Sequence, residues 1–369
     1  MRQGLHVTAY NRQVATKLRQ MGTRGGRNPS PGSLGEGTAQ RSIAVAFAAM
    51  AKVFRLGLVG TGVAARELYA PAFAELAGRV NVVACANRTR AKAERFAKEQ
   101  GIPIVLDDFA SMLAHPEIDG ILISLPIDQQ PRLVLEALRA GIPVLSEKPV
   151  APSVSVGKSL VRKAARYRTP WLVGENFAFL SHVETLDRWL REGRFGEVRL
   201  VQVTHINLMN ARNPYFHTPW RARPGHVGGF VVDGGVHLAN VVRRCFGMPS
   251  VLRSAIASFD SKLPPMDTAL GLLKFPSGAL GTWTSCFSAS YDGPILRVFG
   301  SRANAELTWD SVTIRDAKGK TSTRVNRRNS FVSELLHFKD MVFRGAPPRV
   351  TAADALEDLV LVERLCAGR

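Results

Sequence analysis

Residues 53–65, VFRLGLVGTGVAA, decide the fold of the first half of this chain. Val53–Val59 is a short apolar run that predicts a buried strand, and the residues after the turn have helical spacing. The turn itself reads G-x-G-x-x-A, with Gly60 for a tight turn, Gly62 for close backbone approach and Ala65 for close packing of helix on strand. A helix N-terminus here offers free N–H groups and the positive end of its dipole to an anion. We therefore predict a dinucleotide pyrophosphate site.

Strand and helix candidates alternate from residue 53 to residue 173. The strand candidates are Val53–Val59, Val80–Ala86, Ile121–Leu125, Val144–Ser146 and Trp171–Val173. The helical stretches are Ala64–Ala77, Arg90–Gln100, Asp108–Ala114, Pro131–Ala140 and Val154–Tyr167. This alternation predicts an α/β fold, with a parallel sheet covered by helices on both faces. We assign residues 51–175 to a Rossmann dinucleotide-binding domain.

The second half has a different pattern, which predicts an α+β domain over residues 176–369 with a mainly antiparallel open sheet. The strand candidates are Val198–Asn207, Thr268–Phe275, Ala279–Ser288, Leu296–Phe299, Ala305–Trp309 and Val312–Arg315. The helix candidates are Gly235–Phe246, Val332–Phe343 and Ala352–Cys366, with Thr351 as a good N-cap for the last.

Basic residues are in excess, with 49 Lys and Arg against 30 Asp and Glu and a formal net charge of +19. A nucleic-acid binder usually concentrates such charge on one element, whereas here it is spread along the chain, so nucleic acid is a disfavoured partner. No apolar run reaches the roughly 18 residues of a membrane span. The four scattered cysteines form no C-x-x-C pair, so we expect no metal site, no disulfides and a reducing, cytoplasmic location.

Residues 1–50 differ in composition from the rest. They hold seven Arg or Lys, a single acid and a Gly/Pro/Ser-rich stretch at Gly22–Gly37, which cannot bury enough apolar surface to order itself. Three interpretations compete: an organellar transit peptide, a disordered tail, or a true start at Met50. We favour the last and expect residues 1–50 to lie outside the fold.

The end of the second predicted strand bears on the choice of cofactor. An acid about 20 residues after the glycine turn holds the ribose 2′-hydroxyl in NAD enzymes, but here the chain reads Ala86-Asn87-Arg88-Thr89. Asn87 does not repel a 2′-phosphate, and Arg88 offers a planar guanidinium suited to it. NADP is favoured over NAD. In the alternative, Asn87 accepts the NAD ribose and Arg88 is a solvated charge.

Lys148 and Pro149 follow the strand candidate Val144–Ser146. Ligands of parallel sheets collect beyond the carboxyl ends of the strands, so an ammonium group at Lys148 can bind a substrate hydroxyl and stabilise a forming alkoxide. The Lys148–Pro149 bond is a candidate cis peptide. The alternative is an ordinary surface lysine.

Asp233 and His237 lie four residues apart at the start of the helix expected from Gly235. This spacing puts both on one helix face. Near a helix N-terminus the dipole lowers the pKa of a histidine, which suits a neutral base that removes a hydroxyl proton. Asp233 could bind a substrate hydroxyl or fix the imidazole tautomer. The alternative is a structural histidine with Asp233 as the N-cap.

The glycine turn, Glu147-Lys148-Pro149 and Asp233-Gly234-Gly235-Val236-His237, in this order and at these separations, resemble the glucose–fructose oxidoreductase/inositol dehydrogenase/rhizopine catabolism (Gfo/Idh/MocA) family. The resemblance runs from Val53 onward and includes Val173–Phe177 and the pair Trp220-Arg221. The chain departs from it at Leu125–Gln130, where many members carry Pro-Asn…His, and at Glu175–Phe177, where many carry a basic pair.

The resemblance implies a reaction and a set of site residues. Lys148, Asp233 and His237 would be catalytic. Cofactor contacts would come from Gly60, Thr61, Gly62, Val63, Ala64, Asn87, Arg88, Thr89, Leu125, Pro126, Glu147 and Lys148. Substrate contacts would come from Lys148, Asn176, Trp220, Arg221, Asp233 and His237. Trp220 and Arg221 belong to the loop 209–227, for which a satisfied surface loop is the alternative to a substrate lip.

The motifs predict an NAD(P)-dependent oxidoreductase that moves a hydride between nicotinamide and a CH–OH or C=O group, and the resemblance implies a sugar-like or cyclic polyol as the substrate. The resemblance also implies a homodimer or homotetramer paired through the second sheet. Two other classes stay open: a non-catalytic nucleotide-binding regulator, which would have no use for an acid–base trio, and a glycosidase or lyase that uses bound NAD.

Overall fold

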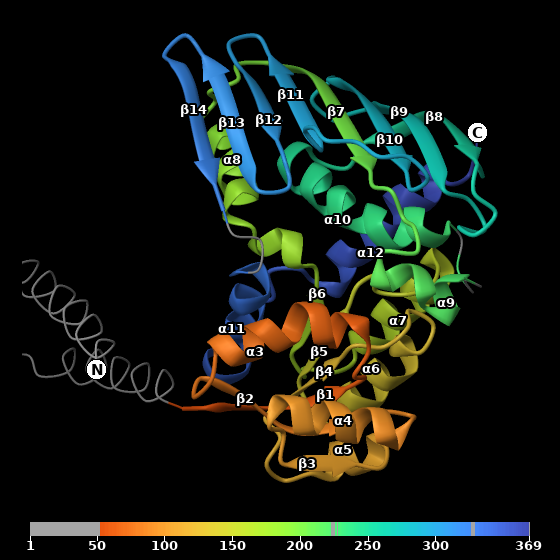
Figure 1. The fold of residues 1–369 in the computed structure, drawn as a ribbon. Helices are drawn as coiled ribbons and strands as arrows, with labels where there is room; N and C mark the ends of the chain where they lie inside the picture. The colour runs from red at the N-terminus through yellow and green to blue at the C-terminus, as the bar shows by residue number, and fades with distance from the viewer. Residues whose placement is uncertain (1–51, 223–225, 227, 326–328, 369) are drawn as a thin grey trace, which may run out of the picture. The chain divides into compact units, whose positions relative to one another are not determined.

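The computed structural model describes residues 52–222, 226, 228–325 and 329–368. The chain divides between Met50 and Ala51, and the expectation for residues 1–50 lies outside the described residues. Two sheets organise the described part, with helices between them and around the first (Figure 1).

The first sheet has six parallel strands in the order β3-β2-β1-β4-β5-β6, which confirms the predicted Rossmann architecture. Its strands are β1 (Phe54–Val59), β2 (Val80–Ala86), β3 (Ile104–Leu106), β4 (Gly120–Ile123), β5 (Val144–Glu147) and β6 (Trp171–Gly174). Its helices are η1 (Ala65–Tyr69), α3 (Ala70–Glu75), α4 (Arg90–Gln100), α5 (Phe109–Ala114), α6 (Gln130–Arg139) and α7 (Val154–Ala164). The strand order reverses beside β1, where the glycine turn begins, and such a switch point is where ligands bind in this architecture.

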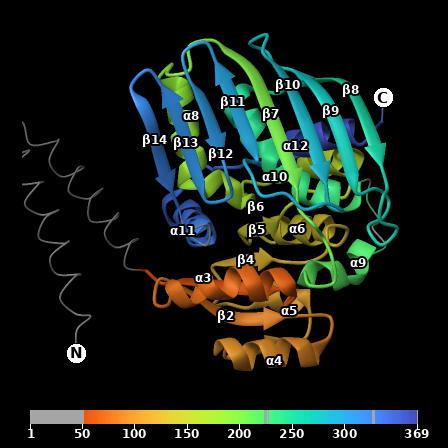
Figure 2. The same ribbon diagram turned by 45° about the horizontal axis from the view of Figure 1, so that its top comes forward.

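The second sheet has eight strands in the order β14-β13-β12-β11-β7-β10-β9-β8 (Figure 2). All neighbours are antiparallel except β7 and β10, so the predicted open, mainly antiparallel sheet is confirmed. The strands are β7 (Val198–Ile206), β8 (Ser250–Ala257), β9 (Thr268–Lys274), β10 (Leu280–Cys286), β11 (Leu296–Gly300), β12 (Asn304–Leu307), β13 (Ser311–Asp316) and β14 (Gly319–Arg324).

One face of the second sheet is covered by three helices, α8 (Ser181–Arg191), α10 (Gly229–Phe246) and α12 (Ala352–Leu365). Alternate strand residues such as Val201, Val203 and Trp283 are buried beneath them. Burial of these apolar faces stabilises the sheet by roughly 25 cal/mol per Å² removed from water.

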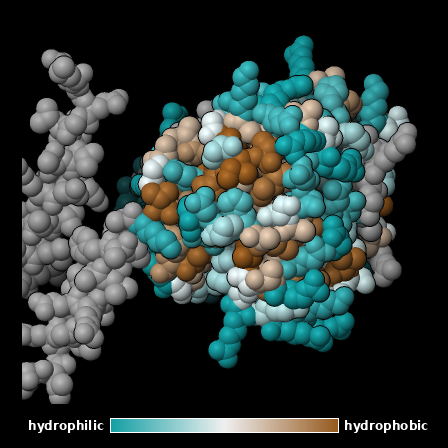
Figure 3. Space-filling model, turned by 90° about the horizontal axis from the view of Figure 1, so that it is seen from below, coloured by the Kyte–Doolittle hydropathy of each residue, from teal (hydrophilic) through white to brown (hydrophobic). Residues whose placement is uncertain are grey.

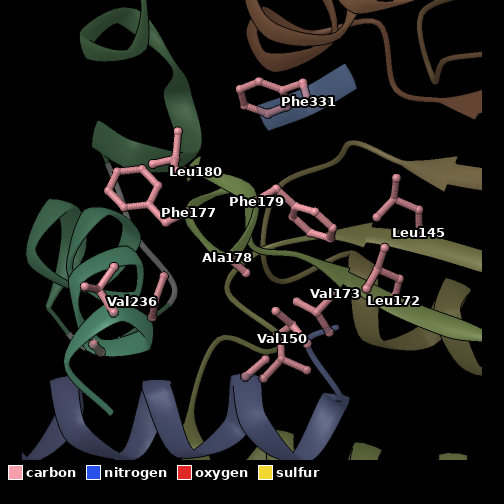
Figure 4. Close-up of a cluster of buried hydrophobic side chains, with 14 of the residues drawn as sticks. Leu145, Val150, Leu172, Val173, Phe177, Ala178, Phe179, Leu180, Val236 and Phe331 are labelled. Atoms are coloured by element: carbon pink, nitrogen blue, oxygen red, sulfur yellow. The ribbon is translucent and has the colours of Figure 1, made fainter. Parts of the chain in front are cut away.

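The last two helices connect the two sheets. α11 (Asn329–Arg344) packs against α3, and α12 packs against α7 and β6 as well as α10. The short segment η2 (Asn176–Phe179) passes between the sheets, and Figure 4 shows Phe177 beside Val236 of α10 while Phe179 is directed toward the strands of the first sheet. The division at residue 175 therefore separates the sheets, but helices from the C-terminal part also cover the first one.

Several predicted boundaries change in the structure. The short strand β3, the helix α8 and the strands β8 and β14 were not predicted, and the helix predicted from Gly235 begins at Gly229. Thr351 caps α12 as predicted, through a reciprocal capping box with Asp354. The Lys148–Pro149 peptide is cis, also as predicted.

Hydrophilic side chains cover most of the face seen in Figure 3, with apolar residues in patches between them. Within the described residues, none of the helices is long and apolar enough to cross a membrane.

Candidate active site

The amine of Lys148 reaches from the end of β5 to helix α10 beneath the second sheet. Its Nζ lies 3.0 Å from Oδ1 of Asp233 and 2.8 Å from the main-chain oxygen of the same residue. The Lys148 side chain is only 16% exposed. An ammonium has three N–H donors. These two acceptors use two of them, which leaves one for a substrate oxygen.

Asp233 is held between two cations. Its second oxygen accepts a hydrogen bond from Nε of Arg221, in the short helix α9 (Pro219–Ala222), at 2.7 Å. Burial alone would raise the pKa of Asp233, but the positive charges of Lys148 and Arg221 hold that pKa well below its usual range. The carboxylate is therefore ionised and fixes the positions of both cations.

Arg221 is itself oriented by aromatic rings. Its guanidinium carbon lies 3.9 Å from the ring centre of Trp220 and 4.7 Å from that of Tyr215 in η3 (Pro214–His217). Cation–π contacts of this kind add to the ion pair with Asp233. The structure thus brings Arg221 to the predicted site, and places Trp220 against it.

His237 follows Asp233 by one turn of α10, and the two lie on the same face as predicted. Its Nδ1 lies 2.7 Å from Oε1 of Glu175, which directly follows β6. The ring of Phe177 stacks on the imidazole, with centres 4.4 Å apart and planes 15° apart. Of the two roles expected for Asp233, fixing the imidazole tautomer is wrong, because Glu175 is the partner of Nδ1.

The dipole argument for His237 is also wrong. Because α10 begins at Gly229 and is preceded by Gly228 at the N-cap, His237 lies in the third turn, whereas the dipole acts within the first. For the same reason Asp233 is not the N-cap. The partners of His237, and not its place on the helix, set its chemistry.

A second histidine, His205 of β7, lies close behind this group. Its side chain is buried against Phe287 and Trp309. Its Nδ1 has no hydrogen-bond partner among the described residues. Burial, together with the charges of His237 and Lys148, lowers the pKa of His205 from 6.5 to about 3, so this imidazole is neutral at physiological pH.

Buried acids gather on the first-sheet side of the site. The hydroxyl of Tyr69 donates to Oε1 of Glu334 in α11 at 3.0 Å. Burial and the nearby charges of Glu147 and Glu175 raise the pKa of Glu334 well above its usual value, so this acid is neutral. Burial also raises the pKa of Glu147, against the charge of Lys148.

The glycine turn fits a dinucleotide. Gly60 has a φ of 97°, and a Cβ there would lie 2.1 Å from the main-chain oxygen of Ser124, so only glycine is accommodated. A Cβ on Gly62 would meet nothing within 4 Å, which leaves open space in front of the turn for phosphates. Thr61 has a buried hydroxyl with no partner among the described residues, and Val63 and Ala64 open the following helix. These residues would hold the pyrophosphate.

The remaining predicted cofactor contacts lie near the same sheet edge. Asn87 and Arg88 follow β2, with Arg88 exposed, and Thr89 precedes α4 without a capping bond from its side chain. Leu125 and Pro126 follow β4 and are half-buried. These positions fit the adenosine and nicotinamide ends of the cofactor, which lie beyond the carboxyl ends of such strands.

Asn176 is the predicted site residue that the structure ties to a different partner. Its buried amide donates to Oγ of Ser330 in α11 at 3.0 Å. Glu175 and His205, by contrast, were missed as site residues. Glu175 directly follows β6, as Lys148 directly follows β5, so its place at a strand end could have identified it. His205 lies on the same buried face of β7 as Val201 and Val203, so the alternation along that strand could have identified it.

Comparison with known proteins places the chain in one class of enzyme. Residues 54–175 match the model of the oxidoreductase family with an NAD-binding Rossmann fold, and residues 183–306 match a C-terminal domain of the same family. This class of oxidoreductase is the Gfo/Idh/MocA family, and the chain belongs to it. Solved structures of this fold include complexes with NAD+ and with NADP.

Individual relatives align over most of the chain. The dehydrogenase FPY6 of Fusarium mangiferae is 28% identical over 84% of this chain and 95% of its own length. The D-apiose dehydrogenase of Paraburkholderia graminis is 25% identical over 85% and 86%. The crystal structure of an oxidoreductase from Thermotoga maritima superposes with a TM-score of 0.81 at 29% identity, covering 86% of this chain and 97% of that one. The resemblance read from the motifs is confirmed.

Proposed function

We propose that this oxidoreductase interconverts a hydroxyl and a carbonyl group on a sugar-like or cyclic polyol, with NADP as the preferred cofactor. The observation that carries the proposal is the meeting of Lys148, from the end of β5, with Asp233 on the same face of α10 as His237. An ammonium and an imidazole beyond the carboxyl ends of a Rossmann sheet can hold an alcohol oxygen and accept its proton, with a carboxylate to position the ammonium.

Each residue has a separate task in this reaction. The nicotinamide, when bound, accepts or returns the hydride at the reacting carbon. The free N–H donor of Lys148 holds the substrate oxygen and stabilises the negative charge that develops on it. His237 takes the hydroxyl proton at Nε2, because its Nδ1 is already bonded to Glu175. Asp233 keeps the amine of Lys148 in place.

The preference for NADP rests on the residues after β2. No acid is present among Asn87, Arg88 and Thr89 to bind a ribose 2′-hydroxyl. Arg88 is exposed and has no ion pair with a described acid, so its guanidinium is available to a 2′-phosphate. The polyol class is supported by the D-apiose dehydrogenase among the relatives.

The open face of the second sheet supports pairing with a second copy of the chain. Four leucines on β7, β9 and β10 are 44–51% exposed on the face opposite the helices: Leu200, Leu270, Leu272 and Leu280. An apolar cluster of this kind marks an interface. All four cysteines are free, which agrees with the cytoplasmic location we propose.

The test is a dehydrogenase assay of the full chain on sugars, inositols and trans-dihydrodiols, with NADP and with NAD. We expect turnover with at least one of these polyols and a lower KM for NADP. His237→Asn should lower kcat by about 100-fold or more, the usual scale for a general base. Near-normal turnover in this variant, or cofactor binding without turnover on every substrate, would refute the proposal.

A further inference from the structure

We propose that Glu175 is a positioning residue for His237, forming with it a carboxylate–imidazole pair that joins the two halves of the site and fixes which ring nitrogen faces the substrate. This inference rests on the proposed function of His237 as the proton acceptor.

The contact geometry assigns the proton. Oε1 of Glu175 lies 2.7 Å from Nδ1 of His237 and 3.1 Å from the backbone nitrogen of Phe177, which donates to it. An ionised carboxylate only accepts hydrogen bonds, so Nδ1 of His237 must be the donor. The lone pair of the neutral imidazole then lies on Nε2. That is the nitrogen left to receive a substrate proton.

The ring is also held in its plane. Phe177 stacks on the imidazole at 4.4 Å, and Trp309 supports Phe177 from the side, with ring centres 6.0 Å apart. Glu175 and Phe177 lie in one short segment that follows β6, so a single piece of chain provides both the hydrogen bond and the stacking surface. The orientation of His237 on α10 is therefore set by the segment that follows β6.

Glu175 is a buried partner of His237 and not a substrate ligand. Its side chain is 3% exposed and cannot itself touch a substrate above His237. Glu334 lies in the same buried region but is neutral, with its Oε1 bonded to Tyr69. A charged carboxylate at Nδ1 stabilises the imidazolium that forms when Nε2 takes the proton, as the acid does in a catalytic triad.

Two further titratable groups interact electrostatically with His237, namely Glu147 at the end of β5 and His205 on β7. Lys148, Arg221 and Asp233 form the ion-pair cluster one turn earlier on α10. None of these is bonded to a ring nitrogen of His237 among the described residues. Glu175 is therefore the group whose removal should change the imidazole most.

The first experiment is independent of activity. Nitrogen-15 NMR of histidine-labelled protein without cofactor, with His237 assigned by its loss in His237→Asn, reports the tautomer directly. We expect the proton on Nδ1 in the wild type, and a change of tautomer population in Glu175→Leu, which removes the acceptor. A wild-type imidazole protonated on Nε2, or an unchanged signal in Glu175→Leu, would overturn the proposal even if the enzyme turns over polyols.

The second experiment is the pH profile of kcat/KM. Glu175→Gln should lower kcat by about 100-fold. It should also move the acidic limb to lower pH by roughly one unit, because the imidazolium loses its counter-charge.

The matched control is Glu334→Gln, which replaces an equally buried but neutral acid and should leave the acidic limb in place. If Glu175 were merely structural, the acidic limb would lie at the same pH in both variants, and that result would contradict the proposal. Absence of turnover in the wild type would sink the proposed function instead.

Discussion

Helix α10 carries two clusters of charged side chains that differ in their ratio of cations to acids. Toward its start, Asp233 binds two cations, Lys148 and Arg221. Toward its end, Arg243 binds two acids of α12, Asp354 and Asp358. The first cluster joins residues from separate parts of the fold at the cofactor edge, whereas the second joins two adjacent helices.

The pKa values of the two buried aspartates move in opposite directions. Burial raises both, but two cations outweigh it at Asp233, whose pKa falls well below its usual range. At Asp358 burial outweighs the charge of Arg243, and the pKa rises to about 7. In the first cluster, two cations surround one acid, so an N–H donor stays free for a substrate. In the second cluster, two acids surround one cation, so no donor is left. We therefore assign chemistry to the first cluster and stability to the second.

The largest expected effect is on the first cluster. Lys148→Met should lower kcat by about 100-fold or more, because the substrate oxygen loses its only ammonium partner. The loss of stability should be smaller than for a change at Arg243, since Asp233 keeps Arg221. Steady-state kinetics and urea unfolding measure the two effects, with the exposed Lys158→Met of α7 as control. Equal kcat in Lys148→Met and Lys158→Met would contradict the assignment of chemistry to the first cluster.

The reverse result is expected at the second cluster. Arg243→Met leaves Asp354 and the buried Asp358 without a counter-charge, and should lower the free energy of unfolding by about 3 kcal/mol. The kcat of the folded fraction should stay close to that of the wild type, because Arg243 contacts none of Lys148, Asp233 and His237. A large loss of kcat with unchanged stability would show that this cluster belongs to the active site.

The smallest effect is a dependence of stability on pH. Asp358 has a folded pKa of about 7, above its ordinary value of 3.8, so the folded state binds more protons between these values. Its contribution to stability is present at low pH and is lost as the pH rises through 7. Asp358→Asn removes this loss, so the stability of the variant relative to the wild type should increase from pH 5 to pH 8. A difference that is constant over this range would show that Asp358 does not titrate there.

Asp233 should show the opposite sign. Its folded pKa lies below 3.8, so its contribution is present above that value and is lost only in stronger acid.

Local patterns were enough to predict the first sheet and its cofactor edge. Short runs rich in apolar residues predicted the strands that precede Gly60 and Lys148. In a parallel sheet the residues that follow such strands lie at the edge where ligands bind. The contact between Lys148 and Asp233 could only be proposed by resemblance, because 85 residues separate the two and a second sheet must fold between them.

Long-range packing explains what the sequence did not predict. The start of α10 at Gly229 was missed because two glycines oppose a helix, and here Gly229 lies against Pro264 in the folded chain. Glu175 was noted within the family resemblance and as a departure from its usual pattern, but not as a site residue, since its partner His237 lies on another element. Strands β8 and β14 are largely exposed and polar or irregular in pattern, which removes the alternation that reveals a strand.

The most direct test of the account is a crystal structure with NADP and a polyol that supports turnover. We expect Nζ of Lys148 and Nε2 of His237 both to lie about 3 Å from the oxygen of the reacting carbon, within hydrogen-bond reach. A bound polyol whose reacting oxygen meets only one of these nitrogens, or lies on the far side of Asp233, would contradict it.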